Sequence, residues 1–420
     1  MHSLKELWKD KKKPSIHAFD LRKYVGPGLL VTVGFVDPGN WAANLAAGSQ
    51  FGYQLLWVVT LSTIMLILLQ HNAAHLGIVT GKCLSEAATA YMKPHIKNFV
   101  LATAVLAAIS TALAELLGGA IALEMLFKIP LRIGSLIMLV LTLYLQFGHF
   151  YKKVEKIIIA FVTLISVAFL VELGIIPVEW ENAATGWVVP AIPDGSMAII
   201  MSVLGAVIMP HNLFLHSEVI QSQHFNTQGE ATIENKLKTE YVDTIFSMCV
   251  GWAINSAIIF VAASAFYANG IEVDDLAQAG ELLTPILGSL SALIFAIALL
   301  FAGISSSLTS AMAGGVIFAG MLGEPYDTTD RHTRFGSCLT MIVAYLIILF
   351  IDHPFDGLIY SQVFLSMQLP LTIFTQLYLT SSKKVMGKYA NKSYTKAALW
   401  IMGIIVTGLN VYLLYDTFAG

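Results

Sequence analysis

The sequence predicts an all-α integral membrane protein in which two five-helix repeats enter the membrane in opposite orientations and an eleventh helix follows. Three observations support this prediction. The 420 residues are 56% hydrophobic and only 12% charged, with a mean hydropathy of +0.73, whereas soluble domains carry about 25% charged residues. Eleven apolar runs follow one another along the chain. Two of these runs, the first and the sixth, contain a proline beside polar residues near their centres.

Each apolar run is long enough to cross the hydrocarbon core of a bilayer as an α-helix, which needs about 20 residues. Helices are expected because lipid cannot satisfy exposed backbone N–H and C=O groups. The predicted spans are 24–50, 53–79, 98–127, 131–149, 154–175, 197–224, 240–268, 285–322, 335–351, 357–380 and 396–416.

The positive charges predict the orientation of these spans. With residues 1–23 as a cytoplasmic N-terminal tail, 22 of the 24 Lys and Arg residues fall in cytoplasmic segments, and only Lys128 and Arg132 fall outside. This distribution follows the positive-inside rule. We therefore expect a multi-pass protein of the cell inner (plasma) membrane with its N-terminus in the cytoplasm.

The first span contains the sequence Asp37-Pro38-Gly39-Asn40. A carboxylate at membrane depth costs roughly 2.5 to 3.5 kcal/mol, so it should face protein, water or a ligand. Pro38 lacks a backbone N–H and Gly39 adds backbone freedom, so the helix is expected to break there. Such a break is tolerated only where it lines a cavity or is buried in protein. The pattern favours an ion site, although the same four residues form ordinary turns in soluble proteins.

The sixth span repeats this pattern with Met209-Pro210-His211-Asn212. Because the two breaks lie five spans apart, the second copy of a five-span repeat must enter the membrane inverted. Paired broken helices at matching positions indicate an inverted-repeat protein with its binding site at the midplane. The predicted units are the repeats 24–175 and 197–380, followed by the span 396–416.

If the two breaks face each other, they offer the Asp37 carboxylate, the Asn40 amide oxygen, the Met209 thioether and freed carbonyls, with Ala206 well placed for one. Oxygens alone would suit magnesium or calcium, whereas a sulfur ligand shifts the preference towards manganese, iron, cobalt or cadmium. Met209 as a simple core residue is the structural alternative.

Other polar residues within the predicted spans can have either a functional or a purely structural role. His211 and His216 can carry protons near neutral pH or can serve only in packing and hydrogen bonding. Glu115 in span three is a functional candidate or the partner of a polar neighbour. Gln362 in span ten can bond between helices or supply an oxygen to an ion. The three cysteines are interpreted as core residues.

An intramembrane metalloenzyme built on the histidines is disfavoured. The pair His71 and His75 has the i, i+4 spacing of a helical metal site but no nearby acid of the HExxH kind. No stretch of the sequence places three ligands and a general base close together. We therefore predict that the protein is not an enzyme.

The two broken-span signatures resemble those of the Nramp divalent-metal transporters, and the likeness covers nearly the whole chain. It extends through Leu76 to Gly81, Asp243-Thr244, Ile254 to Ala257 and Gln362 to Pro370. The resemblance implies a LeuT-like fold and import of manganese or ferrous iron. It also implies metal ligands at Asp37, Asn40, Ala206 (through its carbonyl), Met209 and Gln362, and proton-coupling roles for His211 and Glu115.

Two departures from the family pattern concern the proton pathway. Ala112 stands where members usually carry an aspartate in span three, and no Lys or Arg occurs between Arg334 and Lys383, where members usually carry arginine in span nine. We therefore expect transport of Mn²⁺, with Fe²⁺, Cd²⁺ and Co²⁺ as further candidate ions, and weak or absent proton coupling. The alternatives are an Nramp-related magnesium transporter and a fully proton-coupled symporter. The expected partners are the metal ion and the lipid bilayer, with no resident cofactor, no nucleic acid and a monomeric state.

Overall fold

The structure is a computed structural model that describes residues 37–148, 163–164, 166–171, 173–174, 177–282 and 290–419. Within these ranges the regular structure is entirely helical, and eight helices are long and apolar enough to cross a membrane. The predicted all-α class is therefore confirmed. The predicted N-terminal tail, the first part of span one and most of span five lie outside the described residues.

Seven long helices coincide with predicted spans to within a few residues at each end. They are α4 (Leu56–Thr80), α6 (Pro94–Phe127), α7 (Leu131–Gly148), α15 (Ser291–Leu322), α16 (Arg331–Ile348), α17 (Pro354–Thr380) and α19 (Ser393–Ala419). Shorter helices connect them, including α5 (Leu84–Tyr91), α13 (Ala279–Leu282) and α18 (Lys383–Met386).

Two elements differ from the prediction. Helix α12 (Glu230–Ala265) begins ten residues before the predicted span, because its polar first turns continue the helix beyond the apolar run. Helix α9 (Trp180–Val188) forms where we expected only a loop. It is held against its neighbours by aromatic side chains, since the indole N–H of Trp187 donates to the Ser256 hydroxyl at 3.2 Å. Such contacts between distant segments have no local sequence signal.

The break in span six is present as predicted. Helix α10 (Met197–Val207) ends before Ile208, and α11 (Pro210–Gln221) starts anew with Met209 as its N-cap. In the described part of span one, α3 (Pro38–Phe51) starts at its proline with Asp37 as N-cap. Proline fits the first position of a helix because its missing N–H would have no partner there.

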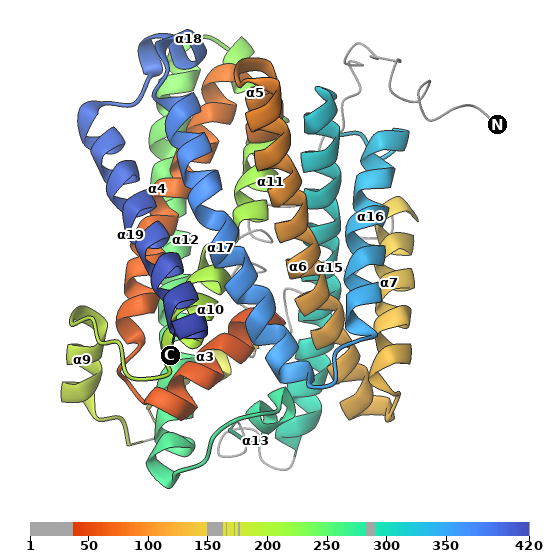
Figure 1. Cartoon of the computed structure of the whole chain (residues 1–420), viewed down its shortest axis with the longest axis vertical. Coiled ribbons are helices and arrows are strands. Elements are labelled where there is room, and N and C mark those ends of the chain that lie inside the picture. Colours follow the sequence, from red (N-terminus) through yellow and green to blue (C-terminus); the bar gives the residue numbers. More distant parts are fainter. Residues whose placement is uncertain are drawn as a thin grey trace.

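The two short helices α3 and α10 pack against each other inside a bundle (Figure 1). Helix α12 covers α3 on one side and α17 covers α10 on the other, while α6 and α15 form a closely packed pair beside them. A Cβ added at Gly303 of α15 would lie 2.9 Å from the backbone N of Gly119 in α6, so small residues permit this close crossing.

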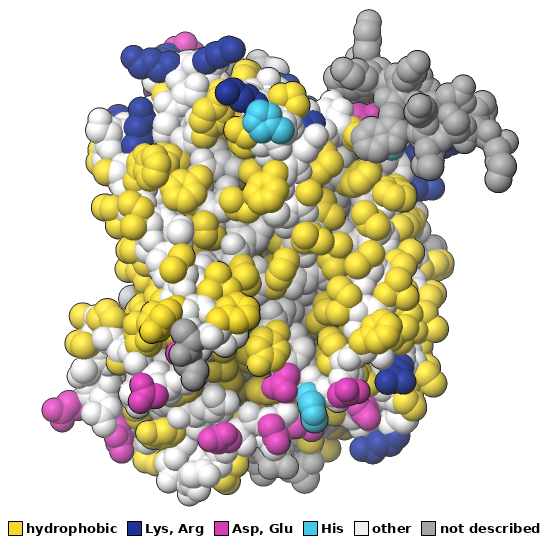
Figure 2. Space-filling model, in the orientation of Figure 1, with side chains coloured by type: hydrophobic (Ala, Val, Ile, Leu, Met, Phe, Trp, Pro, Cys, Tyr) yellow, Lys and Arg dark blue, Asp and Glu magenta, His cyan; other side chains and the backbone are white. Residues whose placement is uncertain are grey.

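The surface charges divide between the two ends of the bundle (Figure 2). We call the end that holds α5 and α18 the basic end, and the end that holds α9 and α13 the acidic end. Most Lys and Arg side chains on this face lie at the basic end, with a few near the acidic end, where the Asp and Glu side chains gather, and exposed hydrophobic side chains lie between the two ends. This is the distribution expected of a protein that crosses a membrane with a fixed orientation.

Candidate metal site

Asp37 is a buried carboxylate at the N-terminus of α3, with 1% of its surface exposed. Its Oδ1 accepts a hydrogen bond from the backbone N–H of Asn40 at 2.8 Å, as an N-cap does. Within the described ranges no Lys, Arg or His forms an ion pair with it. A buried carboxylate that lacks a cationic partner is a natural position for a bound cation.

The Asn40 amide connects the start of α3 to the end of α10. Its Nδ2 donates to Asp37 Oδ2 at 2.7 Å and to the backbone carbonyl of Ala206 at 3.0 Å. Ala206 lies in the last turn of α10, where carbonyls have no partner within the helix and carry partial negative charge. The Asp37 carboxylate at the start of α3 and the Ala206 carbonyl at the end of α10 thus both accept hydrogen bonds from one amide group.

Gln362 of α17 lies directly against this pair. A Cβ added at Gly39 would overlap the Gln362 amide nitrogen, and one added at Gly205 would overlap the Gln362 carbonyl oxygen. Gly205 is therefore required for the close approach of the α17 backbone, whereas a side chain at position 39 would displace the Gln362 amide. Gln362 is fully buried, its Nε2 donates to the Ser361 hydroxyl at 3.1 Å, and its Oε1 accepts no hydrogen bond from the part of the chain that the structure describes.

Met209 is buried at the N-cap of α11, three residues beyond Ala206. Its side chain packs with Ala107 and Leu365, and its Sδ accepts a hydrogen bond from the Asn212 side chain at 3.2 Å. The structure therefore joins Asp37 to Asn40 and Ala206 by hydrogen bonds, and it places Met209 in the same break with its sulfur directed to Asn212.

Two of the proton-pathway candidates, His211 and Glu115, have neutral hydrogen-bond partners. His211 is buried, and its Nδ1 lies 3.1 Å from the Thr111 hydroxyl of α6. Glu115 is buried between α6 and α15 and accepts a hydrogen bond from the Ser306 hydroxyl.

His216 belongs to a different group, which sequence reasoning missed. Its Nε2 lies 3.6 Å from Glu240 Oε1 of α12, and the second oxygen of Glu240 lies 2.5 Å from His71 Nδ1. Glu240 also accepts a hydrogen bond from Thr244 at 2.6 Å. His71 and Glu240 come from distant helices, and no motif links them, so only the fold reveals that the predicted proton candidate His216 shares a carboxylate with His71.

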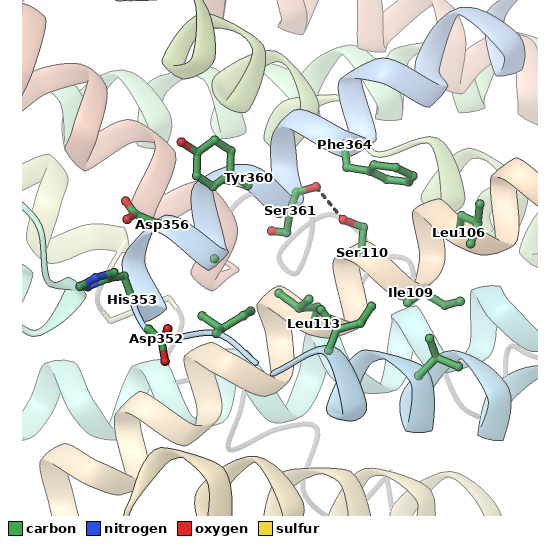
Figure 3. A pocket seen from close by; sticks show the side chains of 14 residues that line it. Leu106, Ile109, Ser110, Leu113, Asp352, His353, Asp356, Tyr360, Ser361 and Phe364 are labelled. Atoms are coloured by element: carbon green, nitrogen blue, oxygen red, sulfur yellow. Dashed lines mark hydrogen bonds between the residues drawn. The ribbon is translucent and has the colours of Figure 1, made fainter. Parts of the chain in front are cut away.

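A groove opens between α6, α16 and α17 near the acidic end (Figure 3). Apolar side chains such as Leu106, Leu113 and Phe364 line most of it, and the Ser110 hydroxyl donates to the Ser361 carbonyl at 2.8 Å on its floor. Ser361 lines the groove, and the next residue of α17, Gln362, lies at the buried site. Asp352, His353 and Asp356 also line the groove, at the end where α17 begins.

Comparison with known proteins identifies relatives over nearly the full chain. The family model described as natural resistance-associated macrophage protein-like matches residues 28–416. The divalent metal cation transporter MntH of Caldanaerobacter subterraneus is 38% identical over 95% of this chain and 94% of its own length. The protein of the same name from Nostoc is 36% identical over 100% of this chain and 97% of its own length.

Solved structures agree with these relatives. A crystal structure of the Eremococcus coleocola manganese transporter superposes with a TM-score of 0.77 at 26% identity, covering 97% of this chain and 90% of that one. The nucleobase-cation-symport-1 family transporter Mhp1, at 15% identity and a TM-score of 0.59, shares the fold over 96% of this chain and 90% of its own. The predicted LeuT-like fold is therefore confirmed. A family match over most of the chain and relatives above 30% identity lead to one conclusion: this chain belongs to the Nramp family of divalent metal transporters, which are not enzymes.

Proposed function

We propose that the protein is a secondary transporter that imports Mn²⁺ by alternating access, with Fe²⁺, Cd²⁺ and Co²⁺ as further substrates. The observation that carries this proposal is the position of the Asn40 amide between Asp37 Oδ2 and the Ala206 carbonyl. The two oxygens come from facing helix breaks, and a cation between them would replace the amide N–H groups with a stronger charge interaction. The relatives named for divalent metal and manganese transport support this cation class.

Each ligand has a distinct role in this proposal. Asp37 supplies the negative charge, and Ala206 supplies a carbonyl oxygen. Asn40 turns its amide so that Oδ1 faces the ion, and Gln362 brings its free Oε1 into contact as the site closes. Met209 leaves Asn212 and supplies the sulfur that favours transition metals over calcium and magnesium. No resident cofactor takes part.

Movement of the short helices would alternate the access. Helix α3 and helix α11 begin at the breaks, so each can tilt without bending a continuous helix. We infer that the basic end faces the cytoplasm, in the inner membrane, because positive loops stay on that side. We expect a monomer, since the site is complete within one chain.

Proton coupling is proposed to be weak or absent. Ala112 is buried on α6, one turn before Glu115, and offers no carboxylate. Helices α16 and α17 carry no Lys or Arg from Phe335 to Thr380, so they lack the arginine that members of the family usually carry there. A fully coupled symporter would have to use Glu115, His211 or Asp37 instead. A magnesium transporter is the other alternative, and it leaves the position of Met209 in the break unexplained.

The test is Mn²⁺ influx into proteoliposomes that contain a pH-sensitive dye, with Asp37→Ala as the inactive control. We expect influx in the wild type, none in the variant, and no acidification of the lumen. Acidification in step with influx would replace uniport with symport. Influx that survives in Asp37→Ala would contradict the proposed site, and strong competition by millimolar Mg²⁺ would favour the magnesium alternative.

A further inference from the structure

A second group of metal-ligating side chains lies towards the basic end. It consists of Cys83 and Glu86 at the start of α5 and Glu218 in the last turn of α11. The Cys83 sulfur and one oxygen of each carboxylate all lie within 4.8 Å of one another. Cys83 and Glu218 are buried, and Glu86 is partly exposed.

The backbone holds these residues together independently of any ligand. Gly81 ends α4 in the left-handed region at φ 63°, which turns the chain sharply into α5. The backbone N–H of Leu84 then donates to the Ser217 hydroxyl of α11 at 2.9 Å, so the start of α5 is fixed beside Glu218. Glu86 Oε2 accepts from the backbone N–H of Cys83 at 3.2 Å. The cluster is therefore built by the fold rather than by chance side-chain positions.

Two buried side-chain oxygens at this group lack a hydrogen-bond donor among the residues that the structure describes. Glu218 is only 5% exposed, and its Oε2 accepts no hydrogen bond from any residue that the structure describes. The nearby Gln221 Oε1 also accepts no hydrogen bond from the described residues. A buried oxygen without a partner costs free energy, which a bound cation would recover.

We propose that Cys83, Glu86 and Glu218 form a second divalent-metal site that takes transition metals through one thiolate and two carboxylates. A sulfur ligand combined with carboxylates suits cobalt, cadmium, zinc or manganese and disfavours magnesium and calcium. Glu218 follows Met209 by nine residues on the same helix, about 14 Å along its axis at 1.5 Å per residue. The site therefore lies between the midplane site and the basic end, where an ion released in that direction can be held. Holding a released ion rests on the proposed transport function, whereas metal binding at the second site does not.

Cobalt binding to the purified full-length protein tests the proposal. A cysteine that ligates Co²⁺ as thiolate gives a ligand-to-metal charge-transfer absorption, and the chain has only three cysteines. We expect this absorption in the wild type and in Asp37→Ala, and its loss in Cys83→Ser. Cys249→Ser and Cys338→Ser are matched controls that should retain it. Serine is a good N-cap residue, so Cys83→Ser should preserve the start of α5.

Stoichiometry separates the two sites. Equilibrium dialysis with Co²⁺ should give two ions per wild-type chain, and one each for Asp37→Ala and the nearly isosteric Glu218→Gln. Absorption that persists in Cys83→Ser, or a wild-type stoichiometry of one that falls to zero in Asp37→Ala, would overturn the second site. Failure of the proposed function is a different result: the absorption would remain while wild-type proteoliposomes take up no metal.

Discussion

At the scale of single residues, Met209 is expected to determine metal selectivity through its sulfur atom. Met209→Leu keeps the buried volume and removes the thioether, a change that usually costs less than about 1.5 kcal/mol of stability. We expect the selectivity for Mn²⁺ over Mg²⁺, measured by how strongly Mg²⁺ inhibits Mn²⁺ uptake, to fall roughly tenfold. This corresponds to a loss of about 1.4 kcal/mol in the free-energy difference between the two ions. Competition assays in proteoliposomes measure this ratio. Met201→Leu, at a fully buried position on α10 away from the break, is the control and should leave the ratio unchanged.

Glu115 provides a second residue-scale prediction. In the structure its carboxyl accepts a hydrogen bond from Ser306, and a glutamine oxygen can accept the same bond. If the protein transports metal without protons, the uptake rate of Glu115→Gln should lie within about twofold of the wild-type rate. The glutamine oxygen replaces the carboxylate oxygen as acceptor, and no proton-transfer step is lost. Initial rates at fixed membrane potential give the comparison. Complete loss of uptake in a variant that still folds, as judged by gel filtration, would assign Glu115 an obligatory protonation step.

The helix starts at Pro38 and Pro210 in the candidate metal site could be predicted because their chemistry is local. A carboxylate beside Pro38 in an apolar run indicates a break without any knowledge of the fold, and Pro210 gives the same signal in span six. The pairing of Glu240 with His71 and the cluster of Cys83 with Glu218 have no such signal. Their members lie more than 130 positions apart, and each residue alone is ordinary. Only the packing of helix ends brings them together.

At the scale of helices, the position of α3 depends on its contact with α6. A Cβ added at Gly118 would overlap the ring of Pro38, so even alanine must push the start of α3 away. We expect Gly118→Ala to reduce Mn²⁺ uptake at least tenfold, since Asp37 directly precedes Pro38 and would move with it. Uptake and thermal unfolding should both be measured.

The matched control for this element lies on α19. A Cβ added at Gly408 has no other atom within 4 Å, so Gly408→Ala changes only helix propensity and should raise stability by up to about 1 kcal/mol. Normal uptake in Gly118→Ala would show that the start of α3 tolerates displacement, and it would separate the position of Pro38 from the function of Asp37.

The helix breaks also show how far element boundaries could be predicted. Proline fixes where α3, α11 and α17 begin, so these starts follow from the sequence. The polar extension of α12 and the helix α9 were missed, because apolar run length predicts only the part of a helix that lies in lipid. The limits of the two repeats stay a prediction.

At the scale of the whole molecule, the charge asymmetry predicts a single orientation. Glu181 lies on α9 at the acidic end, and Lys388 follows α18 at the basic end, where it pairs with Glu230 at 2.5 Å. A membrane-impermeant thiol reagent should label Glu181→Cys in intact cells and Lys388→Cys only after permeabilisation. A background in which all three native cysteines are replaced by serine removes any native signal. Labelling in the reverse order would place the basic end outside.

The coupling prediction also concerns the whole molecule, because it is a statement about which gradients drive accumulation. A uniporter of a divalent ion moves two charges, so an interior-negative potential of 100 mV supplies about 4.6 kcal/mol, or roughly three orders of magnitude of accumulation. For such a uniporter, a pH gradient of one unit should not change the steady-state ratio of internal to external Mn²⁺ concentration. A symporter that couples one proton would gain about 1.4 kcal/mol from the same gradient, a tenfold increase. Measuring the steady-state ratio in proteoliposomes at clamped potential, with and without the pH gradient, distinguishes the two. Because Ala112 and the uncharged span nine remove the usual proton groups, we expect the ratio to follow the potential alone.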